Sequence, residues 1–140
     1  MSKKTIFIAF ITVIALVLIG WGGIALTSGP AFCGSCHVMQ PFKETHAQGI
    51  HQKASCSDCH VPHAIFSKIA YKIKSGTRDI YHNVRKDYPE VITLKEDSKN
   101  IVMQNCARCH AKIIGNVDLP LPNKPCYTCH RNVAHPGLKM

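Results

Sequence analysis

The sequence predicts a mainly α-helical protein with much irregular loop, made of a single N-terminal transmembrane helix and a small domain that follows it. Three observations lead to this prediction. An uncharged apolar run covers residues 5–26, no stretch shows the alternation of a half-buried strand, and all eight cysteines fall into four short repeats. With 140 residues, the chain has room for one domain besides that helix.

The apolar run at residues 5–26 contains 22 residues. As a helix it would be about 33 Å long, which is enough to cross the hydrocarbon core of a bilayer. A cleaved signal peptide has a shorter apolar region of about 7 to 15 residues, so we predict an uncleaved anchor over residues 5–27. Lys3 and Lys4 precede it. The positive-inside rule therefore predicts a cytoplasmic N-terminus at residues 1–4, with residues 28–140 on the outer side.

Each of the four repeats has the form C-x-x-C-H, which is the attachment motif of c-type haem. The two thiols form thioethers with the haem vinyl groups, and the next histidine can reach the iron. The cysteines are Cys33, Cys36, Cys56, Cys59, Cys106, Cys109, Cys126 and Cys129. Zinc sites and disulfides also use paired cysteines, but the histidine after every pair favours haem. We therefore predict four covalently bound haem c groups. Because bacteria attach them in the periplasm, we also predict a periplasmic tetrahaem domain on a single-pass inner-membrane anchor.

The segment outside the anchor is poor in large aliphatic residues, so it would struggle to build an ordinary core. Four haems solve this problem, since the chain can fold around their apolar discs. The formal charge of +9 alone would suggest nucleic acid or an anionic surface as a partner. The haem propionates would add about −8, which leaves a mildly basic holoprotein. We therefore expect no nucleic-acid partner.

The spacing of the motifs suggests two dihaem modules, at residues 33–60 and 106–135. First cysteines are 23 residues apart in the first module and 20 in the second, and those of the second and third motifs are 50 apart. An amphipathic helix over about residues 64–83 would join them, with Ile65, Ile69 and Ile73 recurring at helical spacing. Two placements of this helix stay open. It lies along the membrane surface, or its isoleucines pack on haem while its lysines face solvent.

A second helix is predicted at about residues 98–109, capped by Asp97 or Ser98. The proline-rich stretch Leu119–Pro125 cannot be helix or central strand, so we predict an extended connector between the third and fourth motifs.

Four haems need up to eight axial ligands, of which the motif histidines supply up to four. Among the other histidines, His51 and His135 each lie five residues from a motif. Each reaches a different haem more easily than its own, so we predict both as distal ligands. His46 is the next candidate, whereas His63 and His82 suit the surface. Met39 follows the first motif; its thioether is a possible iron ligand, although spacing alone favours an apolar packing role.

Taken together, these features resemble the NapC/NirT family of membrane tetrahaem cytochromes. The resemblance rests on the single anchor, the four motifs, CGSCHVM at residues 33–39, the stretch at residues 51–79 and CHRNVAH at residues 129–135. Within that family the chain is most similar to members that serve a cytochrome c nitrite reductase. The resemblance implies a quinol dehydrogenase subunit, which oxidises menaquinol at its first haem and supplies a periplasmic reductase that converts nitrite to ammonia.

The resemblance also implies roles for individual residues. Met39, rather than His37, would be the axial ligand of the first haem. Asp79 would lie over the open face of that haem, with Lys72 beside it at the quinol pocket. The proximal ligands of the other haems would be His60, His110 and His130, and the distal ligands His51 and His135. One haem then has no distal ligand in this chain, and a lysine of the catalytic multihaem reductase subunit can supply it.

The spacing of Lys72 and Asp79 suits quinol chemistry, because seven residues are about two helical turns. Asp79 would accept a proton, and Lys72 would hold a quinone oxygen. The residues alone leave two alternatives: a surface ion pair between Asp79 and Arg78, and a lipid-contacting Lys72.

Other functions stay open at this stage. The chain is alternatively a NapC-type donor to nitrate or other periplasmic reductases, a passive electron-relay cytochrome, or, more remotely, a haem-based gas sensor.

Overall fold

The computed structural model describes residues 2–115 and 124–138. Its helices are α1 (Lys3–Leu26), α2 (Pro30–Cys33), η1 (His37–Met39), α3 (Gln40–Gln48), α4 (Cys56–His60), α5 (Ile65–Arg85), α6 (Glu96–Ile114) and α7 (Cys126–Cys129). The described residues contain no strand, which confirms the mainly helical fold class. Most of the predicted connector Leu119–Pro125 lies outside the described residues.

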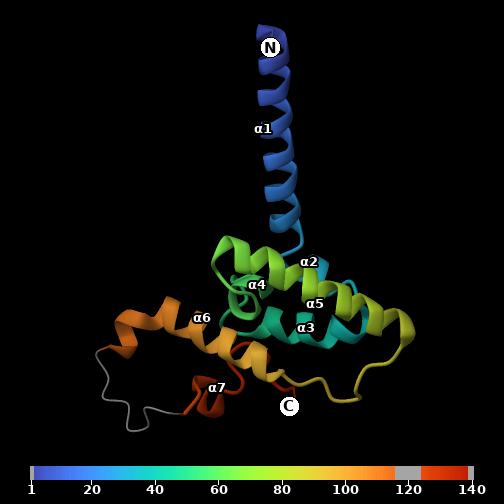
Figure 1. Ribbon diagram of the computed structural model, residues 1–140. Coiled ribbons are helices and arrows are strands. Elements are labelled where there is room, and N and C mark those ends of the chain that lie inside the picture. The colour runs from blue at the N-terminus through green and yellow to red at the C-terminus, as the bar shows by residue number, and fades with distance from the viewer. Residues whose placement is uncertain (1, 116–123, 139–140) are drawn as a thin grey trace.

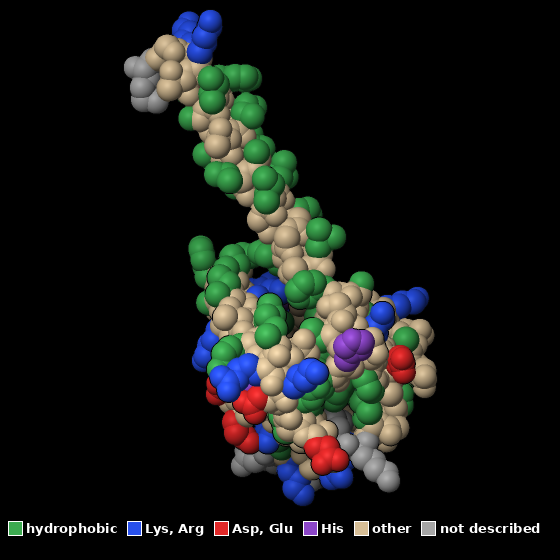
Figure 2. All heavy atoms as spheres, turned by 90° about the vertical axis from the view of Figure 1, so that its right-hand side faces the viewer, with side chains coloured by type: hydrophobic (Ala, Val, Ile, Leu, Met, Phe, Trp, Pro, Cys, Tyr) green, Lys and Arg blue, Asp and Glu red, His purple; other side chains and the backbone are tan. Residues whose placement is uncertain are grey.

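Helix α1 stands apart from the rest of the protein (Figure 1). Its N-cap is Ser2, whose hydroxyl accepts a hydrogen bond from the Thr5 N–H at 3.3 Å. Its 24 residues span about 36 Å. Apolar side chains cover its length and cationic ones lie at its free end (Figure 2). Among the described residues it is the one helix long and apolar enough to cross a membrane, as the sequence predicted.

Helix α5 runs crosswise at the base of α1, with α3 and α6 on its other side (Figure 1). Its bounds, Ile65–Arg85, agree with the predicted helix within two residues. It ends at Lys86, which has a left-handed backbone (φ 54°). There the N–H groups of Lys86 and Asp87 donate to the carbonyls of Asn83 and His82. This ending satisfies carbonyls of the last turn that would otherwise lack partners.

Helix α6 begins earlier and ends later than predicted, and the predicted cap was wrong. Lys95 occupies the cap position and makes no side-chain cap bond, whereas Asp97 lies in the first helical turn. An acidic side chain there is favourable beside the positive end of the helix dipole. The Ser98 hydroxyl instead contacts the Tyr71 hydroxyl of α5 at 2.9 Å, which ties the two long helices together.

The domain lacks an apolar core of its own. No large apolar side chain is buried among the described residues, whereas three polar ones are: His46, Ser57 and Asn105. A domain of this size normally needs buried apolar area or bound groups to stay folded. The structure is therefore consistent with a domain completed by its prosthetic groups.

Asn105 joins the helices of the second and third motifs. Its Nδ2 on α6 donates to the carbonyls of Cys59 (3.1 Å) and Val61 (3.0 Å) at the end of α4, and the residue is only 5% exposed. Asn105→Ala would leave both carbonyls without this donor. We expect it to destabilise the holoprotein by about 1–3 kcal/mol, measured by denaturant unfolding in detergent. Asn100→Ala, at an exposed site on α6, is the control and should change little; equal losses would contradict this role.

Candidate haem and quinol sites

The four motifs occupy different local structures. Three lie on helical turns, in α4, α6 and α7. The first is split: Cys33 ends α2, Cys36 has an extended backbone (φ −81°, ψ 135°), and His37 begins the short 3-10 helix that ends at Met39. The first motif therefore presents its thiols and its histidine differently from the others. This difference fits the expectation that Met39, rather than the motif histidine His37, is the iron ligand at the first motif.

The turn that carries the second motif is fixed by a capping box. The Ser55 hydroxyl accepts from the Asp58 N–H at 3.2 Å, and the Asp58 carboxylate accepts from the Ser55 N–H at 2.8 Å. Burial alone would raise the pKa of Asp58, but the hydrogen bonds with Ser55, together with the charges of Lys68 and Arg108, outweigh it and lower that pKa. A helix of five residues is not stable by itself, so the box positions Cys56, Cys59 and His60.

Each motif lies beside the next along the chain. A hydrogen bond from Cys56 lowers the pKa of the Cys33 thiol to about 7, with a smaller contribution from the Lys72 charge. Burial and then the neighbouring Cys106 raise the pKa of Cys59. Between the third and fourth motifs, the Cys126 N–H donates to the sulfur of Met103 at 3.1 Å. All eight thiols are free in the polypeptide, so no disulfide competes with haem attachment.

Two pairs of histidines face one another across the domain. The ring centroids of His51 and His110 are 6.0 Å apart, and those of His60 and His135 are 6.3 Å apart. Imidazoles on opposite sides of a metal, each bonded at about 2 Å, have centroids about 6 Å apart. Both distances would therefore allow the two histidines of each pair to hold one iron. The structure brings each predicted distal histidine against the histidine of a different motif.

Hydrogen bonds orient the two predicted distal ligands. His135 Nδ1 lies 3.0 Å from the Phe42 carbonyl, and His51 Nδ1 lies 3.4 Å from the Val133 carbonyl. Metal-binding histidines commonly donate their second ring N–H to such a carbonyl, which leaves Nε2 for the metal. Burial, together with His135 and His46, lowers the pKa of His60 to about 4, so its ring is neutral and able to bind a metal.

The remaining histidines differ in their surroundings. His46 is 7% exposed and its ring centroid is 6.1 Å from that of His135, so it stands beside the His60–His135 pair. His63 is exposed, and His82 Nδ1 contacts the Asp87 carbonyl at 2.9 Å. His37 is exposed and lines a hollow of about 460 Å³ with Val38, Pro41, Phe42, Tyr88, Glu90, Val91, Ile92 and Leu138. That volume falls within the range of ligand-binding sites.

Lys72 lies at the C-terminal end of α1. Its Nζ donates to the carbonyls of Ile24 (3.2 Å) and Thr27 (2.9 Å) and to the hydroxyls of Thr27 and Ser28 (both 2.9 Å). A cation is favourable at the C-terminal end of a helix. Burial lowers the pKa of Lys72, and the nearby Cys33 opposes this effect. The sequence carries no signal for Thr27 and Ser28 as partners of Lys72, because only the tertiary structure brings these residues together.

Asp79 is at the surface of α5, two turns beyond Lys72. Its carboxylate is 3.3 Å from the Arg78 Nε, and its side chain is 68% exposed. Among the described residues no salt bridge joins it to Lys72. Met39 is half-buried where η1 meets α3. In the polypeptide, Asp79 therefore makes the surface ion pair that the sequence left open, and its carboxylate remains accessible.

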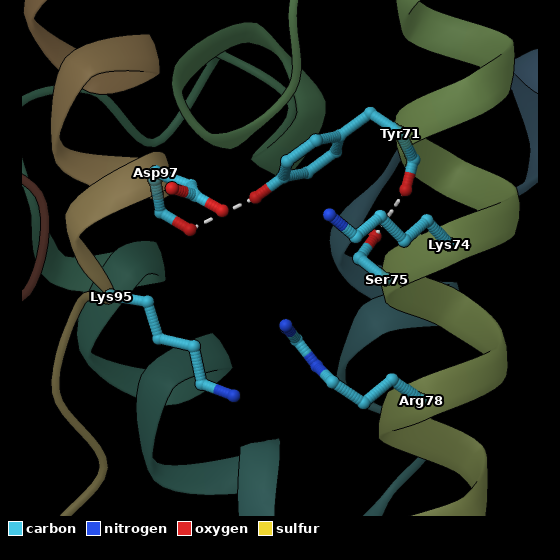
Figure 3. Close-up of a pocket in the computed structure, with 7 residues that line it drawn as sticks. Tyr71, Lys74, Ser75, Arg78, Lys95 and Asp97 are labelled. Carbon is cyan, nitrogen blue, oxygen red and sulfur yellow. Dashed lines mark hydrogen bonds between the residues drawn. The ribbon is translucent and has the colours of Figure 1, made fainter.

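A separate cationic hollow lies between α5 and the start of α6 (Figure 3). Lys74, Arg78 and Lys95 point into it, and Tyr71 bridges it to α6 through the Ser98 hydroxyl. Its volume is about 30 Å³, which is the space of roughly one water molecule. A space of this size does not admit a quinone ring.

A family model and the sequences of known proteins both relate this chain to cytochromes c. The model of the NapC/NirT cytochrome c family, N-terminal region, matches residues 1–140. Cytochrome c nitrite reductase subunit NrfH of Nitratidesulfovibrio vulgaris is 36% identical over 131 residues, covering 94% of this chain and 82% of that protein. Cytochrome c-type protein NrfH of Wolinella succinogenes is 31% identical over 124 residues, covering 79% of this chain and 70% of that protein.

A solved structure matches almost the whole chain. It is a crystal structure of the cytochrome c nitrite reductase NrfHA complex bound to the HQNO inhibitor, with a TM-score of 0.86 and 35% sequence identity. The match covers 99% of this chain and 94% of the other. The chain therefore belongs to the NapC/NirT cytochrome c family, as a membrane-anchored electron-transfer protein that carries haem c.

Proposed function

We propose that the chain oxidises menaquinol at its first haem and passes the electrons to a periplasmic cytochrome c nitrite reductase. Relatives with this partner in their names support the proposal, as does the match to the NrfHA complex. The anchor would lie in the bacterial inner membrane with its N-terminus in the cytoplasm, since Lys3 and Lys4 precede it.

One structural observation carries the proposal: Lys72 joins the end of α1 to the first motif. Its amine lies on the last carbonyls of α1 and interacts electrostatically with Cys33. The Ser57 N–H of the second motif also donates to the Ser28 carbonyl, just beyond α1, at 3.2 Å. The first two motifs are therefore held at the outer end of the membrane helix. A lipid-soluble quinol can reach a redox group only at such a position.

The proposed chemistry assigns separate tasks to two side chains. Menaquinol oxidation releases two electrons and two protons, and the bound haems accept and pass on the electrons singly. The accessible carboxylate of Asp79 accepts the two quinol protons one after the other and releases each to solvent. The Lys72 amine has three N–H groups and four acceptors at the end of α1, so one N–H exchanges its acceptor for a quinol oxygen and stabilises the negative charge that develops there. HQNO, the inhibitor in the matched complex, would bind at this same position.

The ligand geometry supports an order for the haems. Met39 would ligate the first iron, the His60–His135 pair the second and the His51–His110 pair the third. In the described part of the chain no histidine ring faces His130, which is exposed at the fourth motif. The fourth iron would then take its distal ligand from the partner, a lysine of the catalytic subunit. This haem would be the exit toward the reductase.

The test uses the purified holoprotein and a menaquinol analogue. Direct reduction of its haems by the analogue supports quinol dehydrogenase activity; reduction only through another cytochrome would show a passive relay. Affinity purification from the native membrane should recover a multihaem nitrite reductase. Recovery of a nitrate reductase instead would favour the NapC-type alternative.

Replacing Lys72 tests the quinol-binding task. Lys72→Gln should lower the rate of quinol oxidation about 10- to 100-fold, because it removes a charged hydrogen-bond donor, and should weaken inhibition by HQNO. Lys86→Gln, an exposed lysine at the end of α5, is the control and should leave both quantities unchanged. Both variants should keep four haems, measured by haem absorbance per protein. Parent-like turnover and inhibition in Lys72→Gln would contradict the assignment.

A further inference from the structure

One face of α5 exposes large apolar side chains. Phe66, Ile73 and Val84 are 85%, 66% and 74% exposed. At about 100° per residue they lie on one line along the helix, and we call them the outer stripe. Ile69 and Ile80 lie beside it and are 38% and 60% exposed. A continuous apolar face along a helix of 21 residues is too large to leave in water without a partner.

The rest of the domain does not cover the outer stripe. The opposite side of α5 carries Tyr71, Ser75 and Arg78, which face the start of α6 (Figure 3). The first motif lies near Lys72, about 100° around the helix from Ile73. The stripe therefore points away from the protein side of α5 and lies to one side of the first haem attachment site.

The outer stripe lies at the level where the membrane helix ends. Lys72, in the middle of α5, is hydrogen-bonded to the last turn of α1. Apolar atoms gather at the edge of the domain beside the base of α1 (Figure 2). Because α1 spans the bilayer and α5 crosses its outer end, the stripe is placed at the boundary between acyl chains and headgroups.

A cationic side chain lies beside the outer stripe. Arg85 is exposed, on the side of α5 next to the stripe. Arg85 donates to the Tyr81 hydroxyl at 2.7 Å and lies 5.3 Å from the centroid of its ring. A tyrosine with a neighbouring cation suits the headgroup layer, and anionic phospholipids attract such a cation.

We propose that α5 is a second membrane contact, with the outer stripe inserted in the outer leaflet and Arg85 on an anionic phospholipid headgroup. The contact holds the first motif at a fixed depth and orientation, which a single helix such as α1 does not do, because it is free to tilt and rotate. The membrane contact proposed for α5 does not depend on which reductase receives the electrons.

The test places a photo-crosslinking benzoylphenylalanine at position 66 or 73 of the full-length holoprotein, in nanodiscs of equimolar phosphatidylcholine and phosphatidylglycerol. The same residue at position 17 in α1 is the positive control, and at position 100 on α6 the negative control. Lipid adducts are identified by mass spectrometry, after haem absorbance has shown that each variant carries four haems. We expect lipid adducts at positions 17, 66 and 73, and none at position 100.

The same crosslinking residue at position 84, beside Arg85, should give adducts enriched in phosphatidylglycerol, since a cation near the surface changes affinity for anionic lipid by about fivefold. Arg85→Gln should abolish this enrichment and keep the adducts. Adducts without enrichment would overturn the headgroup contact. Adducts at position 17 but not at 66 or 73 would overturn the whole proposal, as would crosslinks from 66 and 73 to another protein in the native membrane.

Discussion

Asp79→Asn is expected to lower the rate of menaquinol oxidation by about 10²- to 10⁴-fold, the usual contribution of a general base. The amide has nearly the shape of the carboxylate but cannot take the proton of the quinol. The carboxylate is accessible on α5, on the helix that brings Lys72 to the end of the membrane anchor. The proton would thus be removed where the quinol meets the first haem.

Asp87→Asn is a closely matched control. Asp79 and Asp87 are 68% and 70% exposed, and each carboxylate is paired with a neighbour, Arg78 at 3.3 Å and His82 at 3.7 Å. Exposed pairs of this kind contribute little to stability, so neither substitution should affect folding or haem content. Any difference between the two variants in quinol turnover therefore results from where the carboxylate lies in the protein.

The measurement is stopped-flow reduction of the haems by a menaquinol analogue, compared with reduction by dithionite. Asp79→Asn should be slow with the quinol and normal with dithionite, whereas Asp87→Asn should be normal with both. Arg78→Gln should also keep parent-like turnover if its ion pair is only a surface contact. Quinol turnover in Asp79→Asn equal to that of the parent would remove Asp79 from the mechanism.

The long helices were predictable because their signals are local. Length and lack of charge define α1, and the repeated isoleucines define α5 within two residues. The start of α6 was not predictable from a capping residue, because Lys95 occupies that position without a side-chain bond. Contacts with α5 fix it instead, through the hydroxyls of Tyr71 and Ser98. Such a contact depends on tertiary structure and has no local sequence pattern.

The haem attachment sites follow from motif spacing, whereas the histidine pairs do not. Spacing indicated that His51 and His135 reach other haems, but their partners are distant in sequence: His110 and His60. Lys72 is a similar case. Its spacing from Asp79 suggested a shared site, yet in the polypeptide its amine binds the end of α1 and Asp79 pairs with Arg78. The partner that each of these side chains takes depends on which other polar groups lie within its reach. Only the tertiary structure determines those groups.

His135→Ala is expected to convert one low-spin haem to a high-spin form, because it removes the predicted distal ligand opposite His60. That haem should stay attached through Cys56 and Cys59, so the haem content should not change. Electron transfer from quinol to nitrite should fall at least about 10-fold, since even indirect partners of metal ligands change activity by that amount. Electron paramagnetic resonance and absorbance spectra measure the spin state.

His63→Ala, at an exposed site beyond the second motif, is the control and should leave the spectra unchanged. His46→Ala tests the competing assignment, because His46 is buried and its ring centroid is 6.1 Å from that of His135. His135 is favoured for two reasons: it lies 6.3 Å from His60, and its Nδ1 is bound to the Phe42 carbonyl, which directs Nε2 toward a metal. Conversion to high spin in His46→Ala, with none in His135→Ala, would transfer the ligand role to His46.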